Sequence, residues 1–262
     1  MLPTGNVNLV NGFRKYFRIS AAVTPIQRDI VFNIRHQVYC EDLKFEPERT
    51  DRREVDAHDS NSLHCLLQSA DQTAQPVGCT RLVFARPDAP DYLLPFEITC
   101  AHTLDRNVID PARLDRHRIG EVSRLAVVAA YRRRRGEARQ VFGLDHGDYG
   151  AIDQPRFPYV PISLYLGAVA LAAHNGIDTL FVLTEPRLAV HFARLGVKIR
   201  QIGGPVMHRG ARIPSMLKVP EIISDLKPSL RPLWEHIHAE MALGVLTGPK
   251  RPVAPELPRS EQ

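Results

Sequence analysis

The spacing of hydrophobic residues predicts one long helix near the N-terminus. Thr24 followed by Pro25 is a favourable helix start, because the hydroxyl caps the first turn and proline suits the first helical position. Apolar residues then recur every four positions from Ile26 to Val38. Because this spacing places them on one face of a helix, the helix is expected to run to about Asp42.

The rest of the pattern predicts short strands that alternate with helices. Strands are expected at 13–19, 63–69, 78–85, 122–130, 179–184, 197–202 and 212–219. Helices are expected at 161–173, 186–195 and 230–246. A turn-rich stretch joins the second and third of these strands as a hairpin. Together the elements predict an α/β (α+β) fold in which helices cover both faces of a mixed, twisted sheet.

One large domain is expected over residues 1–220. It contains two inserts, one at about 86–119 that is interrupted by Pro and Asp, and a basic, then Gly-rich one at about 136–158. Residues 221–246 are expected to form a C-terminal helical extension. The Pro-rich tail at 247–262 is expected to be disordered, because it has too few apolar residues to bury.

The composition is that of an ordinary soluble globular protein, with 44% hydrophobic and 24% charged residues. The four cysteines show no CxxC pairing, and no apolar run reaches the length of a membrane span. The N-terminus lacks the form of a signal peptide, so a cytoplasmic location is expected. His36 and Cys40 stand one helical turn apart, but no second ligand pair accompanies them, and no metal site is expected.

Much of the net charge of +5 lies in the run Arg132, Arg133, Arg134 and Arg135. The charge alone does not choose among nucleic acid, nucleotide phosphates, an anionic membrane surface and an acidic carrier protein as partners. No helix-turn-helix and no aromatic stacking platform is visible in the sequence. Nucleic acid is therefore not expected as a partner.

Charged residues at the ends of separate predicted elements form the most informative pattern in the chain. Paired acids and arginines are costly to bury unless they satisfy one another, and a fold carries that cost most readily where it orients a polar substrate. We interpret the set as the binding site of a polar substrate. Its members are Arg35 with Tyr39 and Phe45, Asp56 with Asp59, Gly78 with Arg81, and Glu121 with Arg124.

The order of elements, with a late helix that ends in the sequence of residues 189–196, resembles the GNAT-type N-acyltransferases. Within them the chain is most similar to the acyl-homoserine-lactone synthases and the N-acyl amino acid synthases. Those families carry Arg-x-x-Val-Phe, an aromatic residue ten positions after the arginine, Asp-x-x-Asp, Gly-x-x-Arg and Glu-x-x-Arg. The corresponding positions here are Arg35, Val38 and Tyr39; Phe45; Asp56 and Asp59; Gly78 and Arg81; Glu121 and Arg124.

Two features set this chain apart from the lactone synthases. Tyr39 and Phe45 stand where those enzymes usually have Phe and Trp, and the chain is longer, so its acceptor pocket is expected to differ from one for S-adenosylmethionine. Residues 203–214 resemble a segment of bacterial acyltransferases that accompany exosortase/PEP-CTERM systems. That group is the preferred assignment.

The resemblance implies catalytic and binding roles for the matching residues. N-acylation from a thioester needs a neutral amine, a route for its proton, and donors to the developing oxyanion. Glu121, beside Arg124, is the candidate for proton removal, and the backbone N–H groups near Leu125 and Ala126 are candidates for the oxyanion. Binding of the acceptor or the acyl donor is expected at Arg35, Tyr39, Phe45, Asp56, Asp59 and Arg81.

Purely structural roles are also open for the same residues. Glu121 and Arg124 would then form an ion pair at a strand end, and such surface pairs are common and weak. Asp56 and Asp59 would cap nearby N–H groups of a loop. Tyr39 and Phe45 would be ordinary core aromatics rather than walls of an acyl or pantetheine channel.

The relatives take their acyl chain from acyl carrier protein, which is acidic. The run Arg132–Arg135 suits that partner and its phosphopantetheine phosphate. With Gly136 the run also resembles the pyrophosphate loop of acetyl-CoA-dependent members, but the second glycine of that loop is missing here. No tightly bound cofactor is expected, and the acyl donor is acyl-acyl carrier protein or acyl-CoA.

The leading hypothesis is an N-acyltransferase that moves a medium or long fatty acyl group to the amine of an amino acid or related small molecule. One alternative is an acyl-homoserine-lactone synthase that consumes S-adenosylmethionine. Another is a basic binding module without catalysis, which would make association with a membrane surface or a carrier its main property.

Overall fold

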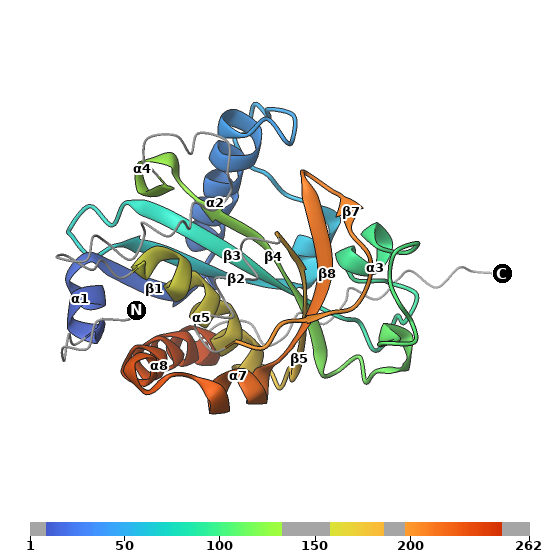
Figure 1. Ribbon diagram of the computed structural model, residues 1–262. Helices are drawn as coiled ribbons and strands as arrows, with labels where there is room; N and C mark the ends of the chain where they lie inside the picture. The colour runs from blue at the N-terminus through green and yellow to red at the C-terminus, as the bar shows by residue number, and fades with distance from the viewer. Residues whose placement is uncertain (1–8, 133–157, 186–196, 248–262) are drawn as a thin grey trace.

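The computed structural model describes residues 9–132, 158–185 and 197–247, and its centre is an eight-stranded sheet (Figure 1). The strand order is β1-β2-β3-β4-β5-β8-β6, with β7 paired to β8. β4 and β5 are parallel, and the other pairs are antiparallel. The strands are β1 (Phe17–Ala21), β2 (Ser62–Ser69), β3 (Pro76–Phe84), β4 (Ile119–Val127), β5 (Thr179–Thr184), β6 (Arg200–Gln201), β7 (Val206–Met207) and β8 (Ala211–Lys218).

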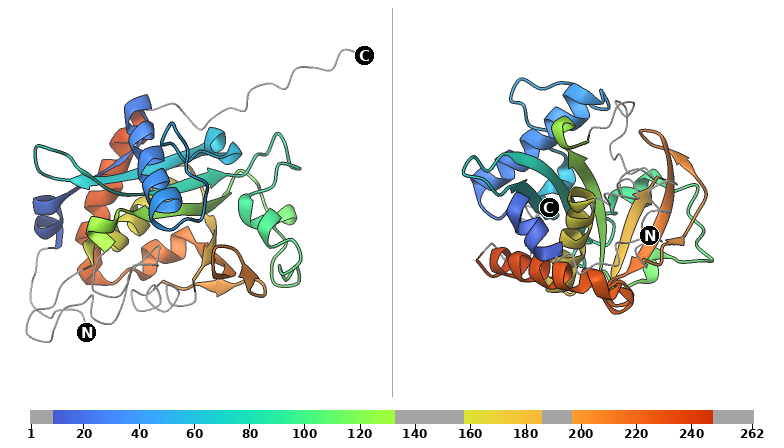
Figure 2. Two further views of the ribbon diagram at one scale, coloured as in Figure 1. Left: turned by 90° about the horizontal axis from the view of Figure 1, so that it is seen from above. Right: turned by 60° about the vertical axis from the view of Figure 1, so that its left-hand side comes forward.

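Helices cover both faces of this sheet, which confirms the predicted fold class (Figure 2). On one face α2 (Pro25–Arg35) continues into a π-helical turn at His36–Asp42, and its apolar residues pack on Leu66, Cys79 and Ala126 of the sheet. On the other face lie α5 (Tyr159–His174) and α8 (Arg231–Thr247). The shorter helices are α1 (Leu9–Tyr16), α3 (Pro95–Thr99), α4 (Ala129–Arg132) and α7 (Val219–Asp225), and 3-10 turns lie at Ala57–Asn61, Pro111–Arg113 and Pro228–Leu230.

Several predicted boundaries are wrong. The strand expected at 13–19 begins only at Phe17, because Leu9 and Phe13 lie one helical turn apart and are both buried as parts of α1. β4 begins three residues earlier than predicted, and Ala129–Arg132 form a helix. Of the strand expected at 197–202 only Arg200–Gln201 is extended, and the short elements α7 and β7 were missed. The predicted helix at 186–195, most of the insert at 136–158 and the tail at 248–262 lie outside the described residues.

The C-terminal extension expected at 221–246 is part of the main hydrophobic core. α8 packs against α5 and β1, and Leu233, Ile237 and Met241 are fully buried there. α5 in turn lies directly on the sheet at Gly167, where a Cβ atom would be 2.6 Å from the Cys65 sulfur and 3.0 Å from Ile19 Cδ1. The helix approaches the sheet this closely because glycine occupies the contact point.

Gly167→Ala is expected to lower the free energy of unfolding by about 1–3 kcal/mol, because the added methyl group overpacks the contact between helix and sheet. Alanine has the higher helix propensity, so that factor alone would raise stability. Urea denaturation followed by circular dichroism measures the change. Gly204→Ala is the matched control, because the nearest atoms to its Cβ would lie at 3.9 Å. An unchanged or more stable Gly167→Ala protein would contradict this packing.

The insert between β3 and β4 is tied at its middle to the segment that precedes β7. Leu104 forms an isolated bridge with Gly203, and the Gly204 N–H donates to the Thr103 carbonyl at 2.7 Å. The Asp105 N–H also donates to the Ile202 carbonyl at 2.9 Å. Closer to the sheet, Phe96 of the insert stacks on Phe181 of β5, with ring centroids 4.3 Å apart.

Candidate active site

The parallel strands β4 and β5 pair only over the first four residues of each. Their register runs from Ile119 opposite Thr179 to Val122 opposite Val182. Beyond this point β5 pairs with β8, whereas β4 follows β3 to Val127. The second half of β4 therefore borders an opening in the sheet.

A bulge in β4 turns its backbone at this opening. Cys79 of β3 lies opposite Ala126, whereas Arg81 lies opposite Ser123, so β4 has one extra residue between them. Arg124 lies in this bulge, and its φ of 52° is in the left-handed region. Such bulges bend a strand and redirect side chains, and they are common beside active sites. Here the bulge lies at the centre of the predicted motif.

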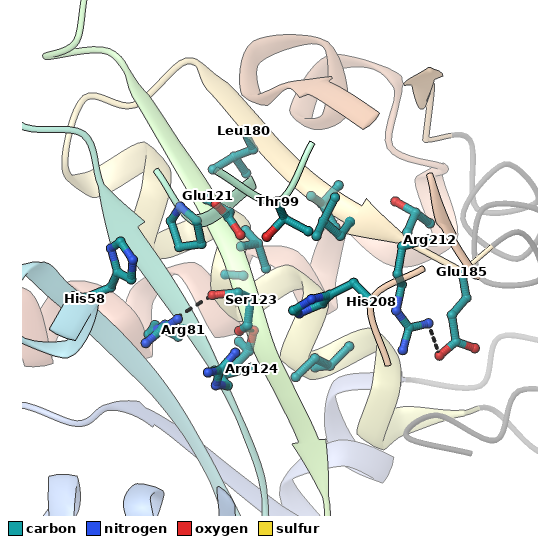
Figure 3. A pocket seen from close by; sticks show the side chains of 18 of the residues that line it. His58, Arg81, Thr99, Glu121, Ser123, Arg124, Leu180, Glu185, His208 and Arg212 are labelled. Atoms are coloured by element: carbon teal, nitrogen blue, oxygen red, sulfur yellow. Dashed lines mark hydrogen bonds and ion pairs between the residues drawn. The ribbon is translucent and has the colours of Figure 1, made fainter. Parts of the chain in front are cut away.

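A cavity of about 470 Å³ occupies the opening (Figure 3), a volume within the range of small-molecule sites. One part of its wall is apolar and comes from α5, β5 and β8. The other part is polar and comes from the 3-10 turn before β2, from β3 and β4, and from the β7–β8 hairpin. The apolar part includes Leu164, Ala168, Val169, Leu180, Val182 and Leu217, and the polar part includes Asp56, His58, Arg81, Glu121, Ser123, Arg124, His208, Arg209 and Arg212.

Arg35 is fully buried and satisfied by two acids. Its Nε lies 2.5 Å from a Glu54 oxygen, and its two terminal nitrogens donate to the Asp59 carboxylate at 2.6 and 3.0 Å. Burial alone lowers the pKa of Arg35, but the hydrogen bond to Asp59 and the charges of both acids outweigh it and raise that pKa. Burial likewise raises the pKa of Asp59, and the bond and charge of Arg35 outweigh it and hold that pKa well below its usual range. Both groups are charged.

Arg81 and Arg124 share the acids of this network. Arg81 donates to Asp56 at 2.6 Å and to Asp59 at 2.9 Å, and its Nε donates to the Ser123 hydroxyl at 3.1 Å. Arg124 donates to Glu54 at 3.1 Å and to Asp56 at 2.7 Å. One terminal nitrogen of Arg81 is buried without a partner among the described residues, although Arg81 lines the cavity. Arg81 therefore has a donor without a partner in the described chain, at a residue that lines the cavity.

Glu121 is almost completely buried, with 2% of its surface exposed, and it lines the cavity. One of its oxygens accepts a hydrogen bond from the Phe96 N–H of α3 at 2.7 Å. Burial raises its pKa to about 8, although this bond and the charges of Arg81 and Arg124 act in the opposite direction. The carboxyl group is therefore mostly protonated at neutral pH. Among the described residues Glu121 forms no ion pair with Arg124, which binds Glu54 and Asp56 instead.

The structure brings the predicted residues together in two layers. Tyr39, Asp56, Arg81, Glu121, Arg124 and Leu125 line the cavity. Arg35 and Asp59 lie behind them in the ion-pair network, Phe45 packs on the apolar cluster that contains Tyr39, and Ala126 is buried in that cluster. The Tyr39 hydroxyl donates to the Leu125 carbonyl at 2.8 Å, and burial raises the pKa of Tyr39 to about 12.

Sequence reasoning missed Glu54 and the β7–β8 hairpin. Glu54 joins Arg35 to Arg124, but it stands in a charged loop that the sequence presents as solvated. The hairpin contributes His208, Arg209 and Arg212 to the cavity wall. The Gly-rich sequence of residues 203–214 indicates a family resemblance but no strand. β7 has only two residues, so an alternation of inward and outward side chains cannot be recognised in its sequence.

The predicted carrier-binding arginines are described only in part. Arg132 forms an ion pair with Asp42 of the π-helical turn, and 8% of its side chain is exposed. Arg133, Arg134 and Arg135 lie outside the described residues. The role of the run in donor binding therefore stays a prediction. In the described ranges no cluster of three or more metal-ligating side chains occurs, and no helix is long and apolar enough to cross a membrane.

Comparisons with known proteins agree with this geometry. Residues 34–141 match the sequence model of an acetyltransferase (GNAT) domain. The comparison with curated protein sequences gave no match. Among solved structures, TofI in a ternary complex with an inhibitor and MTA is 20% identical with a TM-score of 0.54, and the alignment covers 82% of this chain and 98% of TofI.

Two further structures are similar to this chain. BjaI, a CoA-dependent acyl-homoserine lactone synthase solved with MTA, is 20% identical with a TM-score of 0.54, over 84% of this chain and 89% of BjaI. FeeM, an N-acyl amino acid synthase from uncultured soil microbes, is 17% identical with a TM-score of 0.48, over 83% of this chain and 96% of FeeM. At these identities TofI and BjaI establish a shared fold.

The parted parallel strands and the bulge frame the cavity, and the overall fold is GNAT-like. The matched sequence lies across this site, from the end of α2 to beyond β4. Residues 34–141 thus match a GNAT acetyltransferase domain, and this match supports N-acyltransferase activity.

Proposed function

We propose that this enzyme transfers a medium or long fatty acyl group from the thioester of acyl carrier protein to the amine of an amino acid or a related small molecule. The observation that supports it most is the two-sided cavity. Its apolar wall, from α5, β5 and β8, suits a hydrocarbon chain, because burying that chain removes apolar surface from water. Its polar wall suits a small charged acceptor.

The acceptor fits the Asp56 side of the cavity. The Asp56 side chain is 25% exposed, and the acceptor's ammonium group would share this carboxylate with Arg81 and Arg124. Arg81 nearby has the terminal nitrogen that is buried without a partner in the described chain, and such a donor suits the carboxylate of an amino acid. The network of Arg35, Glu54 and Asp59 fixes Arg81 and Asp56 in place.

The thioester fits the second half of β4. A carbonyl held there lies beside the backbone around the bulge, where the N–H groups of Leu125 and Ala126 are candidates to stabilise the oxyanion. Glu121 lies on the same strand and takes part in proton transfer. The sulfur leaves readily, so this reaction needs no covalent enzyme intermediate.

Incubation with acyl carrier protein loaded with chains of several lengths, together with a mixture of amino acids, is expected to give an N-acyl amino acid detectable by mass spectrometry. Parallel reactions with acyl-CoA identify the donor. Release of methylthioadenosine from S-adenosylmethionine would instead identify a lactone synthase, the activity named for BjaI, whose fold is similar. If neither donor gives any amide, the proposed function is wrong.

Three finer expectations remain predictions for the same protein. They are the cytoplasmic location, the association with a membrane surface, and the link to exosortase/PEP-CTERM systems. Identification of the acylated product that accumulates in a bacterium overproducing the protein would give the acceptor amine and the acyl chain length.

A further inference from the structure

The β7–β8 hairpin presents one face to the cavity and the other to solvent. Val206 lies opposite Arg212, and Met207 lies opposite Ala211. Met207 is 81% exposed, and successive side chains of a strand point to opposite faces, so Val206, His208 and Arg212 share the inner face. The turn is closed by the His208 N–H, which donates to the Gly210 carbonyl at 2.9 Å, and Gly210 has a φ of 101°.

His208 reaches the cavity from this inner face. Figure 3 shows its ring directed toward Ser123 of β4, across the opening where the thioester is expected to bind. In the described part of the chain neither ring nitrogen has a hydrogen-bond partner, and the residue is half-buried. A bound substrate therefore meets an imidazole that makes no hydrogen bond to another described residue.

The surroundings of His208 favour its neutral form. Burial lowers the pKa of His208, and the positive charge of Arg124 on β4 lowers it further. On the hairpin itself, Arg209 forms an ion pair with Glu46 and Arg212 forms one with Glu185, so both arginines already have an acidic partner. At neutral pH this imidazole is a proton acceptor.

Glu121 lines the same cavity, and its pKa is shifted in the opposite direction to that of His208. Its carboxyl group is buried, bonded to the Phe96 N–H and mostly protonated at neutral pH, so it is a proton donor. Two titratable groups whose environments move their pKa values in opposite directions are a reliable guide to acid and base roles. The donor lies on the paired half of β4, and the acceptor faces its open half.

We propose that His208 is the general base of the acyl transfer and that Glu121 is its general acid. This inference rests on the proposed function and adds a residue outside the charged motif. The hairpin is then part of the catalytic machinery as well as a wall of the cavity.

The reaction balances with these two groups. The acceptor ammonium first loses one proton to solvent. The neutral amine nitrogen then forms a bond to the thioester carbonyl carbon as the C=O π bond opens to the oxyanion, and the second proton passes from the nitrogen to a ring nitrogen of His208. The carbon–sulfur bond then breaks, and the Glu121 carboxyl protonates the departing thiolate. Transfer of the imidazolium proton to the Glu121 carboxylate through solvent restores both groups. No redox change and no further reactant is involved.

His58 is the other histidine that lines the cavity. Its ring packs edge-on against Tyr92 at 5.4 Å, and its buried Nδ1 has no partner among the described residues. Burial lowers its pKa as well. It belongs to the turn that carries Asp56, on the opposite side of Arg81 from Ser123 in Figure 3, so it is less well placed for the thioester. The experiment has to separate the two histidines.

The test is the pH dependence of kcat/KM, measured by thiol release from acyl-acyl carrier protein with an amino acid acceptor. The wild type is expected to give a bell-shaped profile, with an acidic limb from the base and an alkaline limb near pH 8 from Glu121. His208→Asn is expected to lower kcat by about 10²–10⁴-fold and to remove the acidic limb. Glu121→Gln is expected to remove the alkaline limb.

Controls separate a catalytic role from a structural one. His117→Asn, at an exposed position in the insert, is expected to keep the full profile. Thermal unfolding of His208→Asn is expected to match the wild type, and free imidazole is expected to restore activity to His208→Ala. Persistence of the acidic limb in His208→Asn, or its loss in His58→Asn instead, would overturn the assignment. A wild-type enzyme that makes no amide would refute the proposed function itself, which is a different result.

Discussion

Glu121→Gln is expected to abolish most of the activity, with kcat reduced by about 10²–10⁴-fold. Glutamine keeps the shape of the side chain and still accepts the hydrogen bond from the Phe96 N–H, but it has no proton to transfer. Single-turnover measurements of amide formation show whether the loss lies in chemistry rather than in donor binding. The same variant has a second expected effect, on stability.

The Glu121→Gln protein is expected to be more stable than the wild type in alkaline solution. In the unfolded chain Glu121 loses its proton near pH 4.5, whereas in the folded protein it does so only near pH 8. A raised pKa in the folded state gives stability that is complete below pH 4.5 and is lost as pH rises to 8. Glutamine has no such loss, so the difference in Tm between variant and wild type should grow over this interval.

Thermal unfolding at several pH values measures that difference. Glu235→Gln is the matched control, because Glu235 is exposed on α8 and its replacement should leave activity unchanged. A Glu121→Gln protein that is less stable than the wild type at pH 8 would contradict the raised pKa of Glu121. It would show that the folded protein stabilises the buried carboxylate. Loss of activity with gain of stability is the usual signature of a functional residue.

Arg35→Met is expected to lower the free energy of unfolding by about 3–5 kcal/mol. The substitution leaves Glu54 and Asp59 buried without the guanidinium that satisfies them, and an unpaired buried charge costs much more than the pair contributes. Urea denaturation monitored by fluorescence of Trp234, the single tryptophan, measures the change. Activity should fall as well, because Asp59 also holds Arg81.

Arg53→Ala is the control for this variant. Arg53 forms an ion pair with Asp29 at 2.9 Å, but its side chain is 45% exposed, and such surface pairs contribute about 0–1 kcal/mol. If Arg35→Met and Arg53→Ala lowered stability equally, the buried network would have no special part in holding the fold. The loss of stability in Arg35→Met should become smaller at acid pH, because protonation of Asp59 removes the unpaired buried charge.

The sequence alone predicted the elements in which the spacing of hydrophobic residues repeats several times. The helix that begins at Pro25 has a capping hydroxyl, and β2 and β3 flank a turn-rich stretch, so these elements were predicted correctly. The predicted buried stripe is wrong at its first residue, because Ile26 is 74% exposed. The first helix was mistaken for a strand, because its aromatic residues run on directly into β1. Local propensity cannot place such a boundary when tertiary packing decides it.

The sequence likewise predicted one part of the site and missed another. The motif spacing named Arg35, Asp56, Arg81 and Arg124, which the structure brings into one network. It did not name Glu54, because an acid in a charged loop has no period and no partner visible in sequence. It also did not name the bulge at Arg124, which depends on how β3 and β4 pair.

The insert between β3 and β4 is hydrogen-bonded to the segment before β7. Two parts of the cavity wall, the one at Glu121 and the one at the β7–β8 hairpin, therefore depend on the same insert. The Phe96 N–H that binds Glu121 and the hairpin that carries His208 both connect to the insert, one directly and one through Thr103 and Gly204. A relative with a shorter insert would lose the support of both groups together. The rate of acyl transfer should therefore fall when that segment is shortened, even where every motif residue is kept.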